Sequence, residues 1–312
     1  MQAYLALLSS VLLGLHPDLS PSHVLALALQ SAISLDLHRK LTTPPADAEL
    51  RNRIWWTIYN HERSLAAGSG RPLSIADAEI DADVGRDMTS SFKYTADHQL
   101  PSAQNEDETT DINHFNRIIA YNRLLGEICV DQSTSGIAVD ASEKSRRLKQ
   151  GLEDWLEAWS APDNDETSRS CGRLLYNQAL YLLYRPISRA RLPNTDDLEL
   201  LGRTADESIL TIQKTNSLPI DLLALLWRYQ TAITRLYVIC KTSGKPSKEE
   251  IEICQNVVAV PTTQFDDFQE LRKLKIALER LVNLDREEDK ADKVIEKILF
   301  DLHRPVEGAR EQ

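Results

Sequence analysis

Apolar residues recur at steps of three and four along most of this chain, and that spacing restricts it to helical folds. One such stripe contains Ile112, Phe115, Ile118, Ile119, Leu125 and Cys129, and a later one contains Phe265, Phe268, Leu271, Leu274, Leu278 and Leu281. With only 11 glycines and few alternating β-branched residues, the sequence is unlike that of a large sheet. We therefore predict an all-α protein, an irregular multi-helix bundle of about ten helices.

The chain has 312 residues, and large all-helical domains of this length occur, so one or two units are compatible with it. We predict one domain over residues 1–303 and a frayed tail over residues 304–312. Residues 85–111 are acidic and lack periodicity, which predicts a loop or disordered segment, with an insertion or a lid over a pocket as alternatives.

Local signals predict several helix starts. Ser20 before Pro21 suits the start of a helix that runs to about Leu41. In a capping box, the side chain of each of two residues accepts a hydrogen bond from the backbone N–H of the other. Two pairs have the required spacing: Asp140 with Glu143, and Ser247 with Glu250.

The stretch from Glu49 to Val84 reads as a helix that ends at a glycine turn and leads into an acidic segment. A helical wheel of this stretch places Glu62 in a row of aromatic residues. If it is buried there, its carboxylate requires a cation or several N–H donors. Arg63 follows directly and is expected to point elsewhere, whereas Arg71 returns after Gly70. We hypothesise an ion pair between Glu62 and Arg71 that fixes the turn.

The same stretch resembles the central regulatory domain, or middle homology region, of fungal binuclear zinc-cluster transcription factors. The resemblance is carried by Arg51, Arg53, Trp55, Trp56, Tyr59, Glu62, Arg63, Gly70, Arg71, Pro72, Ile75, Ile80 and Asp81. Segments 28–39 and 175–186 are similar to flanking helices of that family, so the resemblance covers residues 1 to about 189. The family usually has Asp where this chain has Glu62, and Arg and Gly where Gln30 and Asp36 stand.

The resemblance implies a regulatory or effector domain that controls RNA polymerase II transcription in the nucleus, with a protein partner, a homodimer or a small-molecule effector. DNA binding belongs to full-length relatives, whose N-terminal zinc cluster is missing here, which suggests a truncated chain. The alternative is a stand-alone helical co-regulator that binds a ligand or partner and has no DNA binding of its own.

The cysteines and the charge agree with the missing zinc cluster. The four cysteines are scattered singly, whereas a zinc cluster needs six closely spaced thiolates, so we expect no zinc or other cofactor in this chain and a reducing compartment. With a formal net charge of −11, the chain lacks the basic surface that nucleic acids require, so we expect no direct nucleic acid binding. The apolar N-terminal segment is too short to span a membrane.

We also expect no enzyme activity, because the seven histidines stand alone and no phosphate-binding or nucleophile motif occurs. A candidate ligand pocket comprises Trp55, Tyr59, Tyr181 and Tyr184, since aromatic side chains commonly line concave sites. The simpler interpretation is that these four, like Trp56 and Tyr176, fill the space between helices.

Overall fold

The computed structural model describes residues 1–16, 18–43, 47–84, 107–133, 141–160, 166–184, 193–214, 221–260, 265 and 268–283. Over these ranges the chain forms ten α-helices and one 3-10 turn and contains no strand, which confirms the all-α bundle. The helices are α1 (Gln2–Leu12), α2 (Pro21–Ser34), α3 (Ala48–Ser69), α4 (Asp107–Ser133), α5 (Ala141–Trp159), α6 (Glu166–Tyr184), α7 (Thr195–Lys214), α8 (Leu222–Thr242), α9 (Lys248–Val258) and α10 (Gln269–Val282). The turn η1 spans Asp77–Glu79.

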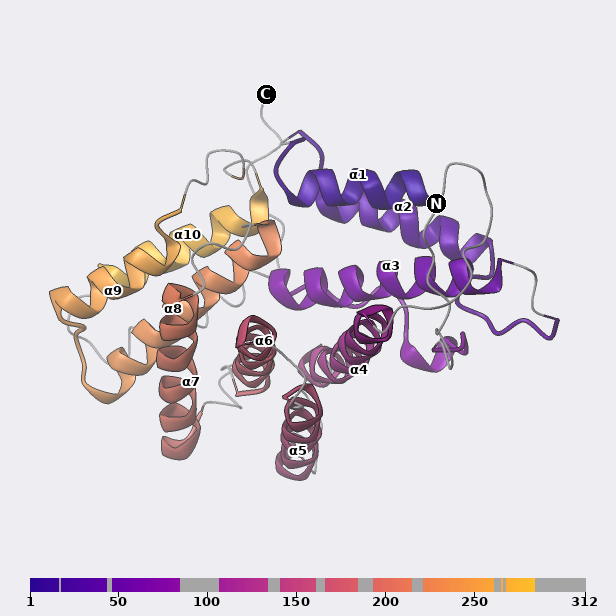
Figure 1. The fold of residues 1–312 in the computed structure, drawn as a ribbon. Helices are drawn as coiled ribbons and strands as arrows, with labels where there is room; N and C mark the ends of the chain where they lie inside the picture. Colours follow the sequence, from indigo (N-terminus) through magenta and orange to yellow (C-terminus); the bar gives the residue numbers. More distant parts are fainter. Residues whose placement is uncertain are drawn as a thin grey trace.

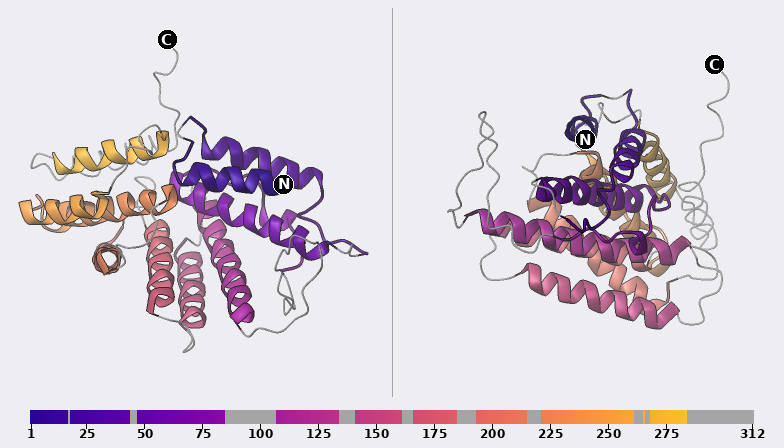
Figure 2. Two further views of the ribbon diagram at one scale, coloured as in Figure 1. Left: turned by 45° about the horizontal axis from the view of Figure 1, so that its top comes forward. Right: turned by 90° about the vertical axis from the view of Figure 1, so that its right-hand side faces the viewer.

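Most helices pack against their neighbours in the chain, so that the bundle follows an arc (Figure 1). Helices α1 to α3 form one side, α8 to α10 form the other, and α4 to α7 lie across the base. In a turned view, α4, α5 and α6 lie side by side beneath this arrangement (Figure 2). The arc closes where α3 contacts α8, and α8 also packs on α6, α7, α9 and α10.

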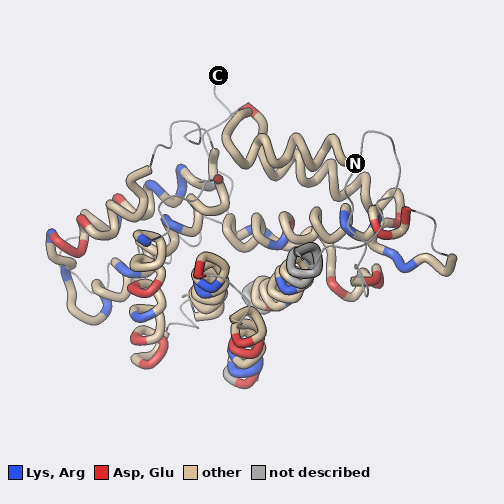
Figure 3. Tube along the Cα trace, viewed as in Figure 1, with Lys and Arg blue, Asp and Glu red and all other residues tan. Residues whose placement is uncertain are grey.

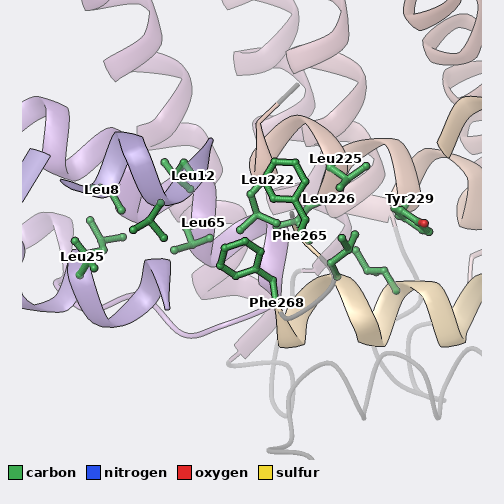
Figure 4. Close-up of a cluster of buried hydrophobic side chains, with 14 of the residues drawn as sticks. Leu8, Leu12, Leu25, Leu65, Leu222, Leu225, Leu226, Tyr229, Phe265 and Phe268 are labelled. Carbon is green, nitrogen blue, oxygen red and sulfur yellow. The ribbon is translucent and has the colours of Figure 1, made fainter. Parts of the chain in front are cut away.

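The main core lies where the two sides of the arc meet. Leu65 from α3 faces Leu222 and Leu226 from α8, and the rings of Phe265 and Phe268 close the cluster beside α10 (Figure 4). These five side chains are at most 4% exposed, and burying a large apolar side chain contributes about 1.5–3 kcal/mol. A second cluster, centred on the buried Trp155 and Trp159 of α5, joins α4, α5 and α6.

The distribution of charged residues differs between helices. Helices α1 and α2 carry no Lys, Arg, Asp or Glu, whereas both signs alternate along α5 and α7 (Figure 3). Leu27 of α2 is 57% exposed, and Leu15, in the connection between the two helices, is 66% exposed.

The predicted helix ends were correct at some positions and wrong at others. Helix α2 begins at Pro21 after Ser20, but it ends at Ser34 instead of near Leu41. It stops there because Asp36 takes a left-handed φ of 52°, which turns the chain out of the helix. The capping box at the start of α9 is confirmed: the hydroxyl of Ser247 accepts from the backbone N–H of Glu250, whose carboxylate accepts in return from the N–H of Ser247.

Other predictions fall partly or wholly outside the described residues. Helix α4 begins at Asp107, before the predicted end of the acidic segment, and residues 85–106 are not among those described. Asp140 of the other capping box, residues 185–186 and the predicted tail over residues 304–312 also lie outside the described ranges.

Candidate functional site

Helix α3 carries the family-like motif and ends in a sharp reversal. Gly70 adopts a φ of 72° at the C-terminal end, a conformation that glycine takes without steric cost. The backbone N–H of Arg71 then donates to the carbonyl of Ala66 at 3.0 Å, which closes the last turn. The chain returns alongside α3 through η1, bringing Ile75 and Asp77 over the buried face of the helix.

The cation at the centre of this reversal is Arg63, whose side chain is fully buried. Its Nη1 donates to the carboxylate of Glu62, and its Nη2 donates to the carbonyl of Ile75 at 2.8 Å and to Oδ1 of Asp77 at 2.9 Å. The guanidinium also lies over the ring of Tyr59, 4.4 Å from its centre. One arginine thereby joins α3 to the returning segment.

The prediction that Arg71 pairs with Glu62 is therefore wrong, because Arg63 forms that ion pair and the side chain of Arg71 is exposed. Adjacent helical positions do diverge by about 100° at the backbone. The long side chain of Arg63 curls back, however, and reaches the carboxylate of its neighbour. The second carboxylate oxygen of Glu62 accepts from the backbone N–H of Ser74 at 2.7 Å.

We call Tyr59, Glu62, Arg63 and Asp77, with the backbone of residues 74–75, the arginine network. The hydroxyl of Tyr59 donates to Oδ1 of Asp77 at 2.9 Å, and burial raises the pKa of this hydroxyl far above its ordinary value. Burial alone lowers the pKa of Arg63, but attraction to Glu62, Tyr59 and Asp77 outweighs it, so the net pKa is raised. Both terminal nitrogens of Arg63 and both carboxylate oxygens of Glu62 are bonded within the network, whereas Nε of Arg63 is buried without a hydrogen-bond partner. These bonds suit a structural lock.

The other motif residues attach neighbouring segments to α3. The indole N–H of Trp56 donates to the carbonyl of Asp83 at 3.1 Å, and Trp55 lies fully buried beside the ring of His38. Arg51 donates to the carbonyl of Leu35 at 2.7 Å, which fixes the turn after α2. Arg53 pairs with Glu49 along the helix at 2.7 Å, and Pro72 is exposed in the returning segment.

The four residues of the candidate pocket occupy different surroundings. Trp55 and Tyr59 are at most 1% exposed and belong to the main core. Tyr184 is half-buried and packs against both core clusters. Tyr181 lines a hollow between α6, α7 and α8, which we call the α6–α8 hollow.

Sequence reasoning missed this hollow, whose lining is mostly polar. The lining consists of Asn177, Gln178, Tyr181, Thr204, Ala205, Ser208, Trp227, Gln230, Thr231 and Thr234. Thr204 and Ser208, and likewise Gln230 and Thr234, are four residues apart on otherwise apolar helix faces, so each pair shares a face and could have been noticed.

The α6–α8 hollow contains about 250 Å³ of empty space when the part open to solvent is counted, and its enclosed part has room for about one water molecule. Gln230 is 2% exposed, and its Nε2 donates to the carbonyl of Gly68 in the last turn of α3 at 2.7 Å. Asn177 donates to Glu207 at 3.2 Å. The hollow is thus connected by a hydrogen bond to the helix that carries the motif.

The residues that the structure describes contain no group of three or more His, Cys, Asp or Glu side chains placed to hold a metal ion. None of their helices combines the length and the apolar character needed to cross a membrane. None of the four cysteines forms a disulfide, and burial raises the pKa of the Cys254 thiol to about 12, so this thiol resists ionisation.

Comparison with known proteins gives one family. The sequence model described as "Fungal specific transcription factor domain" matches residues 2–160. A transcriptional regulatory protein of Schizosaccharomyces pombe is 25% identical over 228 residues, which are 67% of this chain and 28% of that protein. Protein STB5 of Saccharomyces cerevisiae is 24% identical over 292 residues, 79% of this chain and 37% of that protein.

A third relative, Activator of stress genes 1 of Saccharomyces cerevisiae, is 28% identical over 204 residues, which are 59% of this chain and 21% of that protein. The chain therefore spans well under half of the length of these relatives. No solved structure matches the chain.

Proposed function

Because the chain belongs to the fungal specific transcription factor domain family, we propose that it acts as the regulatory domain of a transcription factor in the nucleus. The observation that carries this proposal is the match over residues 2–160, which includes all of α3 and the arginine network. The names of the relatives, among them an activator of stress genes, support a role in transcription.

The geometry of the motif supports a regulatory role rather than catalysis. A catalytic carboxylate needs access to a substrate, whereas Glu62 is 3% exposed and is bonded to Arg63 and to the Ser74 backbone. The arginine network therefore serves in this proposal as a fixed platform that holds α3, the returning segment and α4 in one arrangement.

DNA contacts in this proposal come from a zinc cluster outside the given sequence or from a partner that carries one. The formal net charge of −11 would repel phosphates, and affinity for nucleic acid depends largely on Lys and Arg contacts to them. The partners that we propose for the domain itself are proteins. The exposed Leu27 of the uncharged helix α2 and the exposed Leu15 in the connection that precedes it support protein contacts.

A reporter assay tests the regulatory role. Residues 1–312 are fused to an unrelated DNA-binding domain, with and without an added activation domain, so that both activation and repression are detectable. We expect the fusion to change reporter expression relative to the DNA-binding domain alone. Arg63→Met, which breaks the arginine network, should abolish the change, and Arg203→Met on the exposed face of α7 serves as the matched control.

Unchanged expression in both fusions, with the protein present at normal levels and folded, would contradict the regulatory role.

A further inference from the structure

Exposed leucines gather on the first two helices and on the segments that adjoin them. Among the described residues, nine large apolar side chains are exposed, and five of these lie between residues 13 and 35. They are Leu13, Leu15, Leu19, Leu27 and Leu35, with exposed fractions between 40% and 66%. Single exposed apolar side chains are ordinary, whereas a group of them on one part of the surface indicates a site of contact.

The surface around these leucines is uncharged. Of the ten described helices, only α1 and α2 lack Lys, Arg, Asp and Glu, although such residues make up 27% of the chain (Figure 3). The other exposed residues of these two helices are small or neutral: Gln2, Ala3, Ala6, Ser9, His23, Ala26, Gln30 and Ser34. The outer face of a surface helix normally carries charge, whereas the centre of a protein interface is depleted in it. We call this surface, with the five leucines, the α1–α2 face.

Helix α1 also has few neighbours for an apolar helix. Among the described helices it packs extensively only against α2. Its residues Tyr4, Leu5 and Leu7 are half-buried, in addition to the fully core-facing Leu8 and Leu12. A helix that is apolar on more than one side is usually covered on more than one side, so we expect a further neighbour on the outer side of α1.

The charge of the protein favours a second copy of the chain as that neighbour. Each chain has a formal net charge of −11, so two copies repel each other where acidic surfaces meet. The α1–α2 face lets them meet without opposing charges. A twofold contact places one patch against itself, and an uncharged apolar patch is complementary to itself. A strongly charged partner would instead bury its charge here without a counter-charge.

The shape of this part of the fold suits such a contact. Helices α1 and α2 lie side by side and are joined by a short connection, so they form a helical hairpin (Figure 2). Two helical hairpins that pack face to face form a four-helix bundle. Helices of 11 and 14 residues are about 16 and 21 Å long, which makes the face smaller than a standard interface, so we expect a weak dimer.

We propose that the α1–α2 face binds a second copy of this chain through a twofold contact, in which the two α1–α2 hairpins form a four-helix bundle. The proposal names the partner for the protein contacts suggested above and so rests on that proposed function. Self-association itself is measured without any transcription.

Sedimentation velocity of the full chain, from low to high micromolar concentration, tests the contact. We expect a reversible equilibrium between monomer and dimer with no larger species, because a twofold contact occupies the face on both partners. Added NaCl should leave the dissociation constant unchanged or lower it. Salt screens the repulsion between the two acidic chains, and no ion pair crosses the proposed contact.

Substitutions at exposed positions locate the contact. Leu27→Glu should raise the dissociation constant about tenfold or more, because a twofold contact buries the new carboxylate twice. Ala6→Glu should weaken association in the same way from the exposed side of α1. Leu210→Glu is the matched control, since Leu210 of α7 is 58% exposed, against 57% for Leu27, and lies outside the face. Circular dichroism and the melting temperature of the monomer show that each variant is folded.

Three results would overturn the proposal: a chain that stays monomeric at every concentration, equal effects of Leu27→Glu and Leu210→Glu, or dissociation of the dimer by salt. The last result would mean that ion pairs hold the two copies together elsewhere. If the chain is monomeric while the reporter fusion still responds, the dimer contact is wrong and the regulatory role stands. If the chain dimerises as expected and the fusion is inert, the reverse holds.

Discussion

Arg63 of α3 and Gly126 of α4 are in direct contact, and the contact leaves no room for a side chain at the glycine. A Cβ atom added at Gly126 would lie 2.9 Å from Nε of Arg63. The guanidinium cannot retreat easily, since Glu62, Ile75 and Asp77 hold its two terminal nitrogens. Because Gly126 has no side chain, α4 can pack closely over the arginine network.

Gly126→Ala is therefore expected to destabilise the protein, although alanine is favoured over glycine by about 1 kcal/mol within a helix. Overpacking a buried site costs about 1–3 kcal/mol, so we expect a net loss in the free energy of unfolding, measured by urea denaturation. Gly68→Ala is the matched control, because its Cβ would meet Leu226 at an ordinary 3.5 Å. A stabilising effect of Gly126→Ala would contradict the tight contact.

Removing the cation from the arginine network should lower the free energy of unfolding more than Gly126→Ala does. Arg63→Met leaves the carboxylate of Glu62 buried with a single backbone donor, and breaking a buried ion pair in this way costs about 3–5 kcal/mol. The double variant Glu62→Gln/Arg63→Met should recover part of that loss, because the amide is neutral and still accepts from the N–H of Ser74.

Arg71→Met is the control for this series, since the Arg71 side chain is exposed and even an ion-paired exposed arginine typically contributes about 0–1 kcal/mol. Chemical denaturation of all three variants gives the comparison. Equal losses for Arg63→Met and Arg71→Met would show that the network is not centred on Arg63.

The end of α2 predicts a stabilising substitution. Asp36 is exposed and has a left-handed φ of 52°, which costs most L residues about 1–2 kcal/mol and glycine nothing. Asp36→Gly should raise the melting temperature, and Asp36→Val should lower it. Gln30→Gly, a replacement by glycine at an exposed position inside the helix, should be destabilising. A lower melting temperature for Asp36→Gly would be incompatible with the described turn.

The capping box of α9 predicts that replacing its first residue, Ser247, lowers the stability of the protein. Ser247→Ala removes the hydroxyl that accepts from the N–H of Glu250, and such a cap contributes about 1 kcal/mol. Thermal unfolding should show a lower midpoint, whereas Ser9→Ala on the exposed face of α1 should leave it unchanged or slightly higher. Identical midpoints for both variants would argue against the cap.

The helical class and the capping box could be predicted because both depend on residues close together in sequence. Repeats of three and four mark the apolar faces, and the pair Ser247 and Glu250 forms its box within a single turn. The resemblance in residues 49–84 likewise identified the family, because its residues occur in a fixed order along one helix and the turn that follows.

The partner of Glu62 and the α6–α8 hollow could not be predicted in the same way. A helical wheel gives the direction of each Cβ atom but not the path of a long side chain. It therefore predicted that Arg63 points away from Glu62, although the guanidinium reaches that carboxylate. The lining of the hollow comes from three helices, and whether Gln178 meets Ser208 or Gln230 depends on how these helices pack.

Gln230 belongs to two structures at once, since its amide nitrogen donates to the carbonyl of Gly68 in the last turn of α3 and its side chain forms part of the lining of the α6–α8 hollow. Turning that amide would remove its bond to Gly68. A mutation in α8 that moves the Gln230 side chain should therefore also loosen the glycine turn at the end of α3, although the two places lie far apart in the sequence.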